Sequence, residues 1–175
     1  MSITIRFGLP TDASELAELA ARTFHETFAA DNRADDMALH LATAYGPAQQ
    51  HAELTSPDTI TLVAEVDARL IAYAQLRTGE APECVRGVSP VELWRFYVSR
   101  EWHGRGVAQA LMRSVETEAS RLGGRTLWLG VWERNDRAQA YYRKAGFVDK
   151  GSHAFMVGND LQTDRIMERS LSPVT

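Results

Sequence analysis

The sequence predicts a single α/β domain, on three observations. The chain has 175 residues, 45% of them apolar, which is enough for one domain with a buried core. Short β-branched and aromatic runs alternate with longer amphipathic runs, as strands and helices do. The third observation is a strand-type run at 92–98 that leads through a turn into a glycine-rich segment, 103–108, and then an amphipathic run to Leu122.

The first part of the chain predicts a strand and two helices. Residues 3–7 have a strand pattern, and Thr11 is expected to cap the helix that follows. The inward face of this helix follows helical spacing and consists of Leu16, Leu19, Ala20 and Phe24. A second helix is predicted over 35–45, where Gly46-Pro47 is expected to end it.

The middle of the chain predicts a hairpin and a long loop. Residues 59–65 and 70–77 are strand-like and are separated by Asp67-Ala68, so we expect them to pair. Residues 79–90 contain two prolines and two glycines, which predicts a mobile loop before the strand at 92–98.

The last third predicts a helix between two sets of strands. Gly123-Gly124 supplies the left-handed residue that commonly ends a helix, and a strand containing Trp128 follows. A helix is expected over 136–145, closed by Gly146. Residues 151–157 and 163–169 predict a final hairpin across 158–160.

The glycine-rich segment is the strongest functional signal. Gly104 and Gly106 with Ala108 let the backbone approach a ligand, and the next helix directs unpaired N–H groups toward it, so the segment predicts a phosphate site. A Walker loop is excluded because Val107 and Ala108 occupy its Lys and Ser/Thr positions. A dinucleotide loop would need glycine where the chain has Gln109. On this segment alone, a glycine-rich connection without a ligand stays the alternative.

Composition excludes several other classes. Cys84 is the single cysteine, so no internal disulfide can form, and no apolar run approaches the roughly 18 residues of a membrane span. The net charge of −4 argues against broad nucleic-acid binding, and no secretory signal is visible at the N-terminus. We expect a soluble, cytoplasmic protein with neither nucleic acid nor membrane as partner. No HExxH or CxxC pairing predicts a metal.

A second motif follows about thirty residues after the glycine-rich segment. Its members, at the spacing N-x-x-A-x-x-x-Y-x-x-x-G-F, are Asn135, Ala138, Tyr142, Gly146 and Phe147. With the HGRGVA run at 103–108, the chain resembles the GNAT superfamily of acetyl-CoA-dependent N-acetyltransferases, although His103 stands where that pattern prefers Arg or Gln. The resemblance implies one GNAT domain over 1–175, with a mixed, mainly antiparallel sheet flanked by helices.

Three further phrases are similar to the PaiA-type spermidine/spermine N-acetyltransferases. They are the FHETF run at 24–28 with Asn32 and Met37, the LGVWE run at 129–133, and the region from 151–153 through 162–164 to Met167. The similarity then extends over nearly the whole chain and implies a polyamine as the preferred acceptor.

The resemblance also implies how acetyl-CoA would bind. Backbone N–H groups from about Gly104 to Gln109 would hold the pyrophosphate without a metal, and the strand at 92–98, splayed by a bulge, would pair with the pantetheine amides. Asn135 would contact the same arm, or cap the helix that begins at Asp136, or both. The residues expected to bind acetyl-CoA are Phe96, Tyr97, Val98, His103, Gly104, Arg105, Gly106, Val107, Ala108, Gln109, Asn135 and Tyr142.

Acetyl transfer to an amine needs a proton acceptor and a proton donor. An ammonium of pKa about 10.4 must lose a proton before attack, and Glu92, six residues before Val98, is the expected general base, with a solvated strand-end carboxylate as the alternative. Tyr142 is the expected donor to the departing thiolate, with simple packing on the sheet as the alternative. Adjacent Tyr141 is expected to be a core or surface residue.

Acceptor residues are less specific in sequence. His25, Glu26 and His153 are candidates for the amine pocket, although lone histidines are more often structural. We expect direct transfer from acetyl-CoA to a primary amine, preferably a polyamine, in a protein compatible with homodimer formation. The alternatives are a protein N-terminus, a lysine or a small aminated metabolite or drug as acceptor, or a noncatalytic acetyl-CoA-binding regulator.

Overall fold

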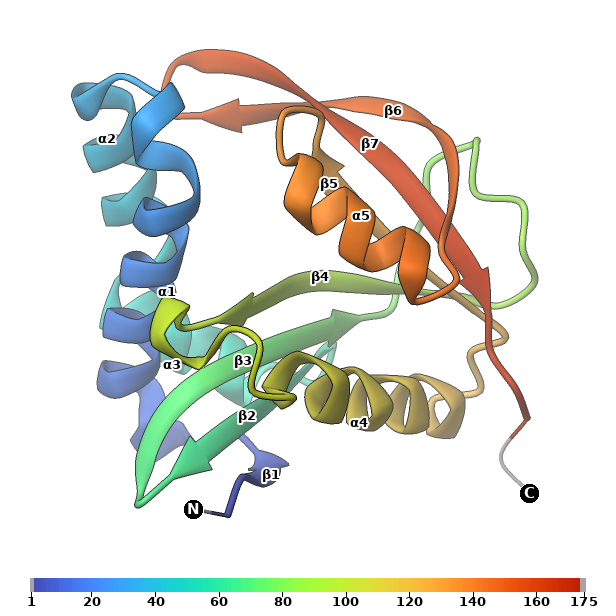
Figure 1. Cartoon of the computed structure of the whole chain (residues 1–175), viewed down its shortest axis with the longest axis horizontal. Coiled ribbons are helices and arrows are strands. Elements are labelled where there is room, and N and C mark those ends of the chain that lie inside the picture. The colour runs from blue at the N-terminus through green and yellow to red at the C-terminus, as the bar shows by residue number, and fades with distance from the viewer. Residues whose placement is uncertain (1, 174–175) are drawn as a thin grey trace.

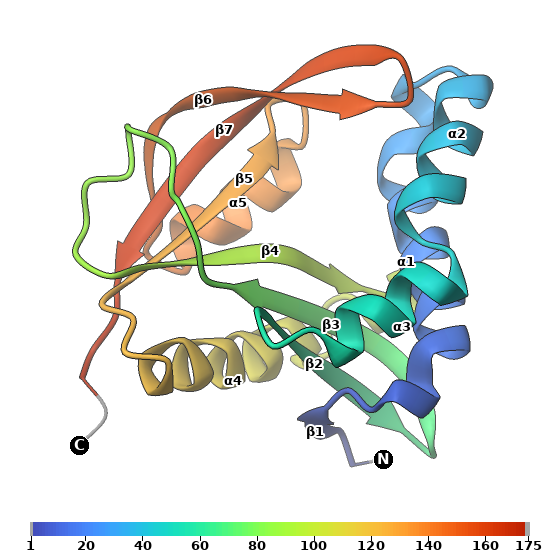
Figure 2. The ribbon, with the colours of Figure 1, turned by 180° about the vertical axis from the view of Figure 1, so that it is seen from behind.

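The computed structural model describes residues 2–173, which form one sheet with helices on both faces (Figures 1 and 2). The sheet has seven strands in the order β1-β2-β3-β4-β5-β7-β6. Their bounds are β1 Thr4–Phe7, β2 Thr59–Val66, β3 Arg69–Arg77, β4 Pro90–Val98, β5 Thr126–Trp132, β6 Val148–Val157 and β7 Asp160–Ser170. All neighbours are antiparallel except β4 and β5, which confirms the predicted mixed, mainly antiparallel sheet.

Five helices bury their apolar faces against the sheet. They are α1 Ala13–Phe28, α2 Ala34–Ala44, α3 Pro47–Thr55, α4 Val107–Arg121 and α5 Asp136–Lys144. Helices α4 and α5 pack on one face, whereas α1 and α2 belong to a second core on the other (Figures 1 and 2). No helix among residues 2–173 is long and apolar enough to cross a membrane.

The sheet divides at its centre, between β4 and β5. These two strands pair only from Pro90 to Glu92, opposite Thr126 to Trp128, and then separate. The β3–β4 register slips between Gln75 and Leu76, which leaves Trp94 as an extra residue in β4. Such a bulge bends a strand and increases its twist. The remaining β5-facing edge of β4 therefore borders a gap, as the resemblance described above implies.

Several element boundaries differ from the sequence prediction. Thr11 is not the cap of α1: it lies inside a 3-10 turn, Pro10–Asp12, and Asp12 occupies the cap position. The prediction also missed α3, because Gly46-Pro47 ends α2 but begins α3, with Pro47 in the first turn, where its missing N–H costs nothing. The final hairpin is longer than predicted, since Asp160 already belongs to β7.

Other predicted boundaries are confirmed. Asp67 and Ala68 both have positive φ, 50° and 61°, as a two-residue hairpin turn requires. Gly123 and Gly146 have φ of 81° and 91° just beyond α4 and α5. The irregular connection between β3 and β4 is tied to the sheet, because the Thr126 hydroxyl donates to the Val88 carbonyl at 3.0 Å.

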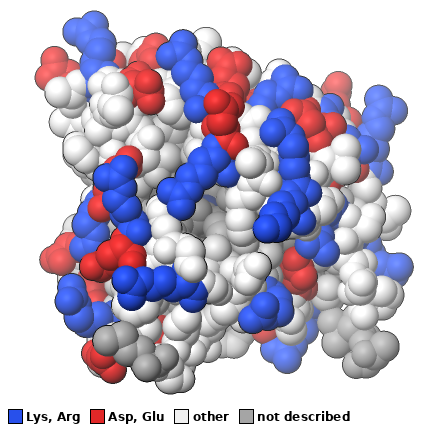
Figure 3. All heavy atoms as spheres, in the orientation of Figure 1, with Lys and Arg blue, Asp and Glu red and all other residues white. Residues whose placement is uncertain are grey.

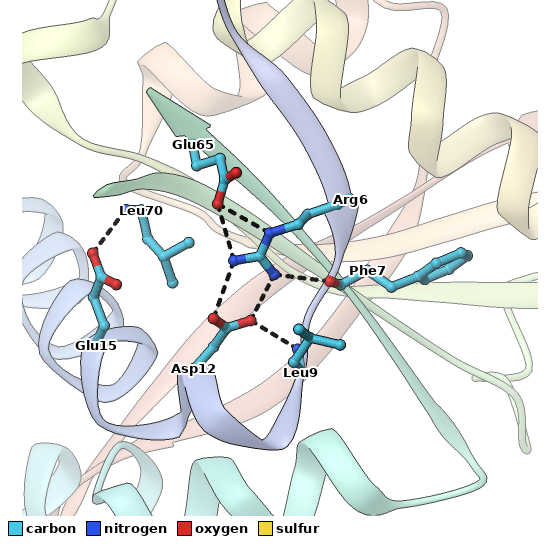
Figure 4. Close-up of polar contacts among 7 residues, drawn as sticks. All are labelled: Arg6, Phe7, Leu9, Asp12, Glu15, Glu65 and Leu70. Carbon is cyan, nitrogen blue, oxygen red and sulfur yellow. Dashed lines mark hydrogen bonds and ion pairs between the residues drawn. The ribbon is translucent and has the colours of Figure 1, made fainter. Parts of the chain in front are cut away.

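An ion cluster joins β1 to the start of α1 and to β2 (Figure 4). Arg6 donates to both carboxylate oxygens of Asp12, at 2.7 and 3.1 Å, and to Glu65 at 3.0 Å. The Leu9 N–H also donates to Asp12, at 2.7 Å. Mainly because of the Arg6 hydrogen bonds, the pKa of Asp12 lies below its usual value. The cluster fixes the entry angle of α1, on which one wall of the site depends.

Candidate active site

A cavity of about 710 Å³ occupies the gap between β4 and β5 and extends onto the sheet face covered by α1 and α2. Most of the predicted site residues line it. They are Glu26, Glu92, Phe96, Tyr97, Val98, His103, Ala108, Asn135, Tyr142 and His153. These residues come from β4, β6, three helices and two connections, so only the fold brings them together.

The glycine-rich segment turns into α4 at one end of this cavity. Gly104 and Gly106 have φ of 74° and 81°, and a Cβ at either position would have no atom within 4 Å. The glycines are therefore required by the left-handed backbone and not by lack of space. The first helical hydrogen bond into this turn is from the Ala110 N–H to the Gly106 carbonyl, so the N–H groups of residues 107–109 begin the helix without intrahelical partners. This geometry suits a pyrophosphate.

His103 is turned toward the strand that precedes the segment. Its Nε2 lies 2.8 Å from the Val98 carbonyl oxygen, to which it donates. Arg105 is exposed, with its guanidinium 5.3 Å from the Trp102 ring centre. The expected pyrophosphate contact of His103 would thus compete with an existing hydrogen bond.

Positive side chains gather around a hollow near the middle of the face seen in Figure 3. Arg100, from the turn before the glycine-rich segment, and Arg137, in the first turn of α5, both line the cavity. The sequence analysis did not single them out, because isolated arginines carry no motif. Their guanidinium groups could hold the phosphates of a coenzyme.

Two adjacent tyrosines of α5 have different environments. Tyr142 lines the cavity, is 8% exposed, and burial raises its pKa, so the phenol stays protonated. Tyr141 also lines the cavity, but it is only half-buried, stacks on Phe96 and donates to the Ala108 carbonyl at 3.1 Å. Burial raises the pKa of Tyr141 to about 12. Tyr141 thus ties α5 to α4, whereas Tyr142 presents a protonated donor group.

Asn135 caps α5 and borders the cavity at the same time. Its Oδ1 accepts from the Ala138 N–H at 3.1 Å, which confirms the capping role. The side-chain amide N–H₂ is the part of Asn135 that could still serve a ligand.

Glu92 lies where β4 leaves β5 and is held by Arg77. Both Nε and Nη2 of Arg77 donate to its carboxylate, Nη2 at 3.3 Å. The Arg77 guanidinium also lies 4.1 Å from the centre of the Trp94 ring. Glu92 is therefore a partly buried, charge-paired carboxylate on the cavity wall and not a freely solvated strand end.

The opposite wall comes from α1 and from the β6–β7 hairpin. Glu26 lines the cavity with Thr23 and Thr27 of the same helix face, but His25 is exposed and lies outside the lining. His153 of β6 lines the cavity, with its Nε2 3.7 Å from Oδ2 of Asp164. The structure thus brings Glu26 and His153 to one cavity and leaves His25 apart.

Asp164 is a cavity residue that the sequence analysis did not choose. It is 8% exposed, and burial raises the pKa of its carboxyl to about 6. The available signal was alternation, because Asp164 shares a strand face with Ile166, which is fully buried. A carboxylate at an inward position of a strand is unusual enough to mark a site. No cluster of metal-binding side chains occurs among residues 2–173.

Comparison with known proteins agrees with this geometry. Residues 15–147 match the family model described as the acetyltransferase (GNAT) family. An uncharacterised N-acetyltransferase of Mycobacterium tuberculosis is 35% identical over 161 residues, covering 92% of this chain and 99% of the relative. An aminoglycoside N(6′)-acetyltransferase of Stenotrophomonas maltophilia is 28% identical over 149 residues, covering 83% and 86%.

The fold also matches solved structures. The PaiA N-acetyltransferase of Thermoplasma acidophilum, crystallised with coenzyme A, aligns with a TM-score of 0.80 and 22% identity, over 97% of this chain and 99% of that one. At this identity the likeness concerns the fold. The family model and the mycobacterial relative establish the family as well as the fold. The chain belongs to the GNAT family as an acetyl-CoA-dependent N-acetyltransferase, an acyltransferase of class EC 2.3.1.

Proposed function

We propose that the protein transfers an acetyl group directly from acetyl-CoA to a primary amine, with a polyamine such as spermidine or spermine as the preferred acceptor. One observation carries this proposal: a single cavity joins the gap between β4 and β5 to a wall that bears the carboxylates of Glu26 and Asp164, neither of which is paired with an arginine or lysine in the part of the chain that the structure describes. A cosubstrate in the gap would therefore have an acidic surface beside it, which favours a cationic acceptor.

The bound cosubstrate would use the elements described above. The N–H groups at the start of α4 would hold the pyrophosphate, and Arg100, Arg105 and Arg137 would supply positive charge around it. The free edge of β4 from Phe96 to Val98 would pair with the amides of the pantetheine arm, as an added strand pairs with a sheet edge.

The acceptor must lose a proton before it attacks the thioester. At pH 7 an ammonium of pKa about 10.4 is more than three units from neutral, so its deprotonation costs roughly 4 to 5 kcal/mol. Glu92 is the proposed proton acceptor, through a water molecule because Arg77 holds both of its oxygens. The amine nitrogen then bonds to the acetyl carbon as the C–S bond breaks.

Tyr142 is the proposed donor to the departing sulfur. Its raised pKa keeps the phenol protonated, so it can donate a hydrogen bond while negative charge develops on the thiolate. Complete proton transfer to a thiolate would be uphill, so the proposed contribution is stabilisation of the charge as the C–S bond breaks.

The choice of acceptor rests on two kinds of support. The resemblance to PaiA-type enzymes and the acidic wall favour polyamines. The similarity to an aminoglycoside N(6′)-acetyltransferase favours a small aminated compound of another kind as the second candidate. A noncatalytic regulator would bind acetyl-CoA without turnover.

The test is acetyl-CoA-dependent release of free thiol by the purified protein. Spermidine, spermine, kanamycin, a lysine peptide and a peptide with a free α-amine are compared with a sample lacking acceptor. Turnover with the polyamines alone is the expected result. Turnover with kanamycin alone would show that the acceptor is a small aminated compound of the second kind. Binding of acetyl-CoA without turnover on any amine would favour a noncatalytic regulator.

A further inference from the structure

Asp164 is a buried carboxylate whose charge the described part of the chain does not neutralise well. Its Oδ1 is inaccessible and has no hydrogen-bond partner among residues 2–173. Its Oδ2 lies 3.7 Å from His153 Nε2, which is longer than a hydrogen bond. A buried ionised group without partners is costly, so an external cation would be a favourable ligand.

Asp164 lies on the cavity wall beside a glycine of the neighbouring strand. Asp164 pairs with Trp132 across the β5–β7 ladder and with His153 across the β6–β7 ladder. The neighbouring position on the same face of β5 is Gly130, where a Cβ would come within 3.1 Å of Asp164 Oδ2 and 3.3 Å of His153 Nε2. The Asp164 and His153 side chains therefore lie close over Gly130, where a larger residue would crowd them, and all three residues line the cavity.

Asp164 lies too far from the gap to contact the amine that is acetylated. Its position suits a second amine of the same acceptor. The transfer must occur where β4 and β5 separate, and β7 lies on the far side of β5 from that gap. Neighbouring strands are about 4.8 Å apart, so β7 and Asp164 lie at least one and a half strand spacings, roughly 7 Å, from the middle of the gap. Three or four methylene groups between two amines span a comparable distance.

We propose that Asp164 binds the second, non-reacting ammonium group of a diamine or polyamine acceptor. The inference rests on the proposed function, and it identifies the residue that distinguishes such acceptors from monoamines. His153 and Gly130 shape the same subsite, His153 as its side wall and Gly130 by the absence of a side chain.

The charged groups around Asp164 give the subsite a dependence on pH. His153 faces it from β6, Glu133 follows β5, and Glu26 of α1 and His40 of α2 line the same cavity. Since burial raises the pKa of the Asp164 carboxyl to about 6, affinity for a dication is expected to increase as pH rises through that value.

The experiment compares Asp164→Asn with wild type on spermidine and on n-butylamine, which has no second cation. We expect kcat/KM for spermidine to fall at least tenfold, mainly through KM, whereas kcat/KM for butylamine and the Kd for acetyl-CoA change less than threefold. The matched control is Asp160→Asn, which removes an exposed charge from the same strand outside the cavity and should change none of these values.

Three results would overturn the inference while leaving the proposed function intact. They are an unchanged KM for spermidine, an equal loss with butylamine, or a melting temperature lowered by Asp164→Asn, which would indicate a structural role. If wild type acetylates neither amine, calorimetric titration of spermidine into the coenzyme A complex decides the matter. Binding at least tenfold tighter to wild type than to Asp164→Asn supports the subsite, and equal or absent binding excludes it.

Discussion

Asp12 and Asp164 are equally buried, at 9% and 8% exposure, yet their environments have opposite effects on ionisation. Asp12 accepts hydrogen bonds from Arg6 and from the Leu9 N–H, and its pKa lies below the usual value. Within the described chain, Asp164 has no hydrogen-bond partner at Oδ1 and only His153, at 3.7 Å, beside Oδ2, and burial raises its pKa to about 6. Burial alone therefore does not tell a structural carboxylate from a functional one. The partners do, because a satisfied carboxylate stabilises the fold and an unsatisfied one reduces its stability.

The comparison extends to the regions around these residues. The Arg6 cluster joins three elements and lies outside the lining of the cavity of about 710 Å³, whereas Asp164, Tyr142 and Glu92 all line that cavity. Substitutions in the cluster are expected to change stability with little effect on turnover. Substitutions in the cavity are expected to do the reverse.

The largest expected effect is that of Tyr142→Phe. Loss of the hydroxyl removes the proposed donor to the thiolate, and kcat should fall about 100-fold, or about 2.7 kcal/mol of activation free energy. Steady-state kinetics on the best acceptor measure it. Tyr141→Phe is the control, since its hydroxyl donates to the Ala108 carbonyl and not to a reacting group. Equal losses of kcat in both variants would contradict the role of Tyr142.

The next effect concerns the structural carboxylate. Asp12→Asn weakens the bonds with Arg6 and leaves that guanidinium with Glu65 as its charged partner, so unfolding free energy should fall by about 2 kcal/mol at pH 7. Urea denaturation measures the change. Turnover of the folded variant should stay within twofold of wild type. A large loss of kcat with unchanged stability would remove the distinction between the two regions.

A smaller effect is expected for Gly106→Ala, which tests whether the glycine turn before α4 binds acetyl-CoA or only shapes the helix. Gly106→Ala places a side chain at φ 81°, which costs about 1 to 2 kcal/mol, and the distorted turn should weaken acetyl-CoA binding about tenfold. Isothermal titration calorimetry measures the Kd. Gly123→Ala is a matched control, because Gly123 has the same φ at the other end of α4 and a Cβ there also meets nothing within 4 Å. A similar loss of affinity in the control would indicate a general effect of destabilising α4.

The smallest effect is a difference in pH dependence. Asp12 has a lowered pKa, so its contribution to stability is present above the unfolded value of about 3.8 and is lost as pH falls through its folded value. Asp164 has a raised pKa, so its penalty is absent below about pH 3.8 and complete above about pH 6. Melting temperatures from pH 3 to 8 should show Asp164→Asn equal to or above wild type near neutrality, whereas Asp12→Asn lies below it. Both differences should decrease in acid.

The sequence by itself predicted most of the helices and strands and the left-handed glycine turn before α4. Helical and alternating apolar patterns act locally, as do the turn at Asp67-Ala68 and the cap at Asn135, so they can be read from neighbouring residues. Gly104 and Gly106 also meet a local requirement, because each has a positive φ that favours glycine. The helix α3 was missed because a proline after a helix can end one element or begin another, and Thr11 was misjudged because a 3-10 turn starting at Pro10 moves the cap of α1 to Asp12.

Tertiary structure alone decided the acceptor side. The bonds between Arg77 and Glu92, the distance from His153 to Asp164 and the exclusion of His25 from the cavity depend on strand register and helix rotation, which no local pattern specifies. The lack of a hydrogen-bond partner for Asp164 Oδ1 among the described residues is also a tertiary property, because a residue's partners come from strands and helices far away in sequence. Glycine conformations and apolar periods are encoded locally, whereas the balance of charge in a buried cavity is set by the packing of the whole chain.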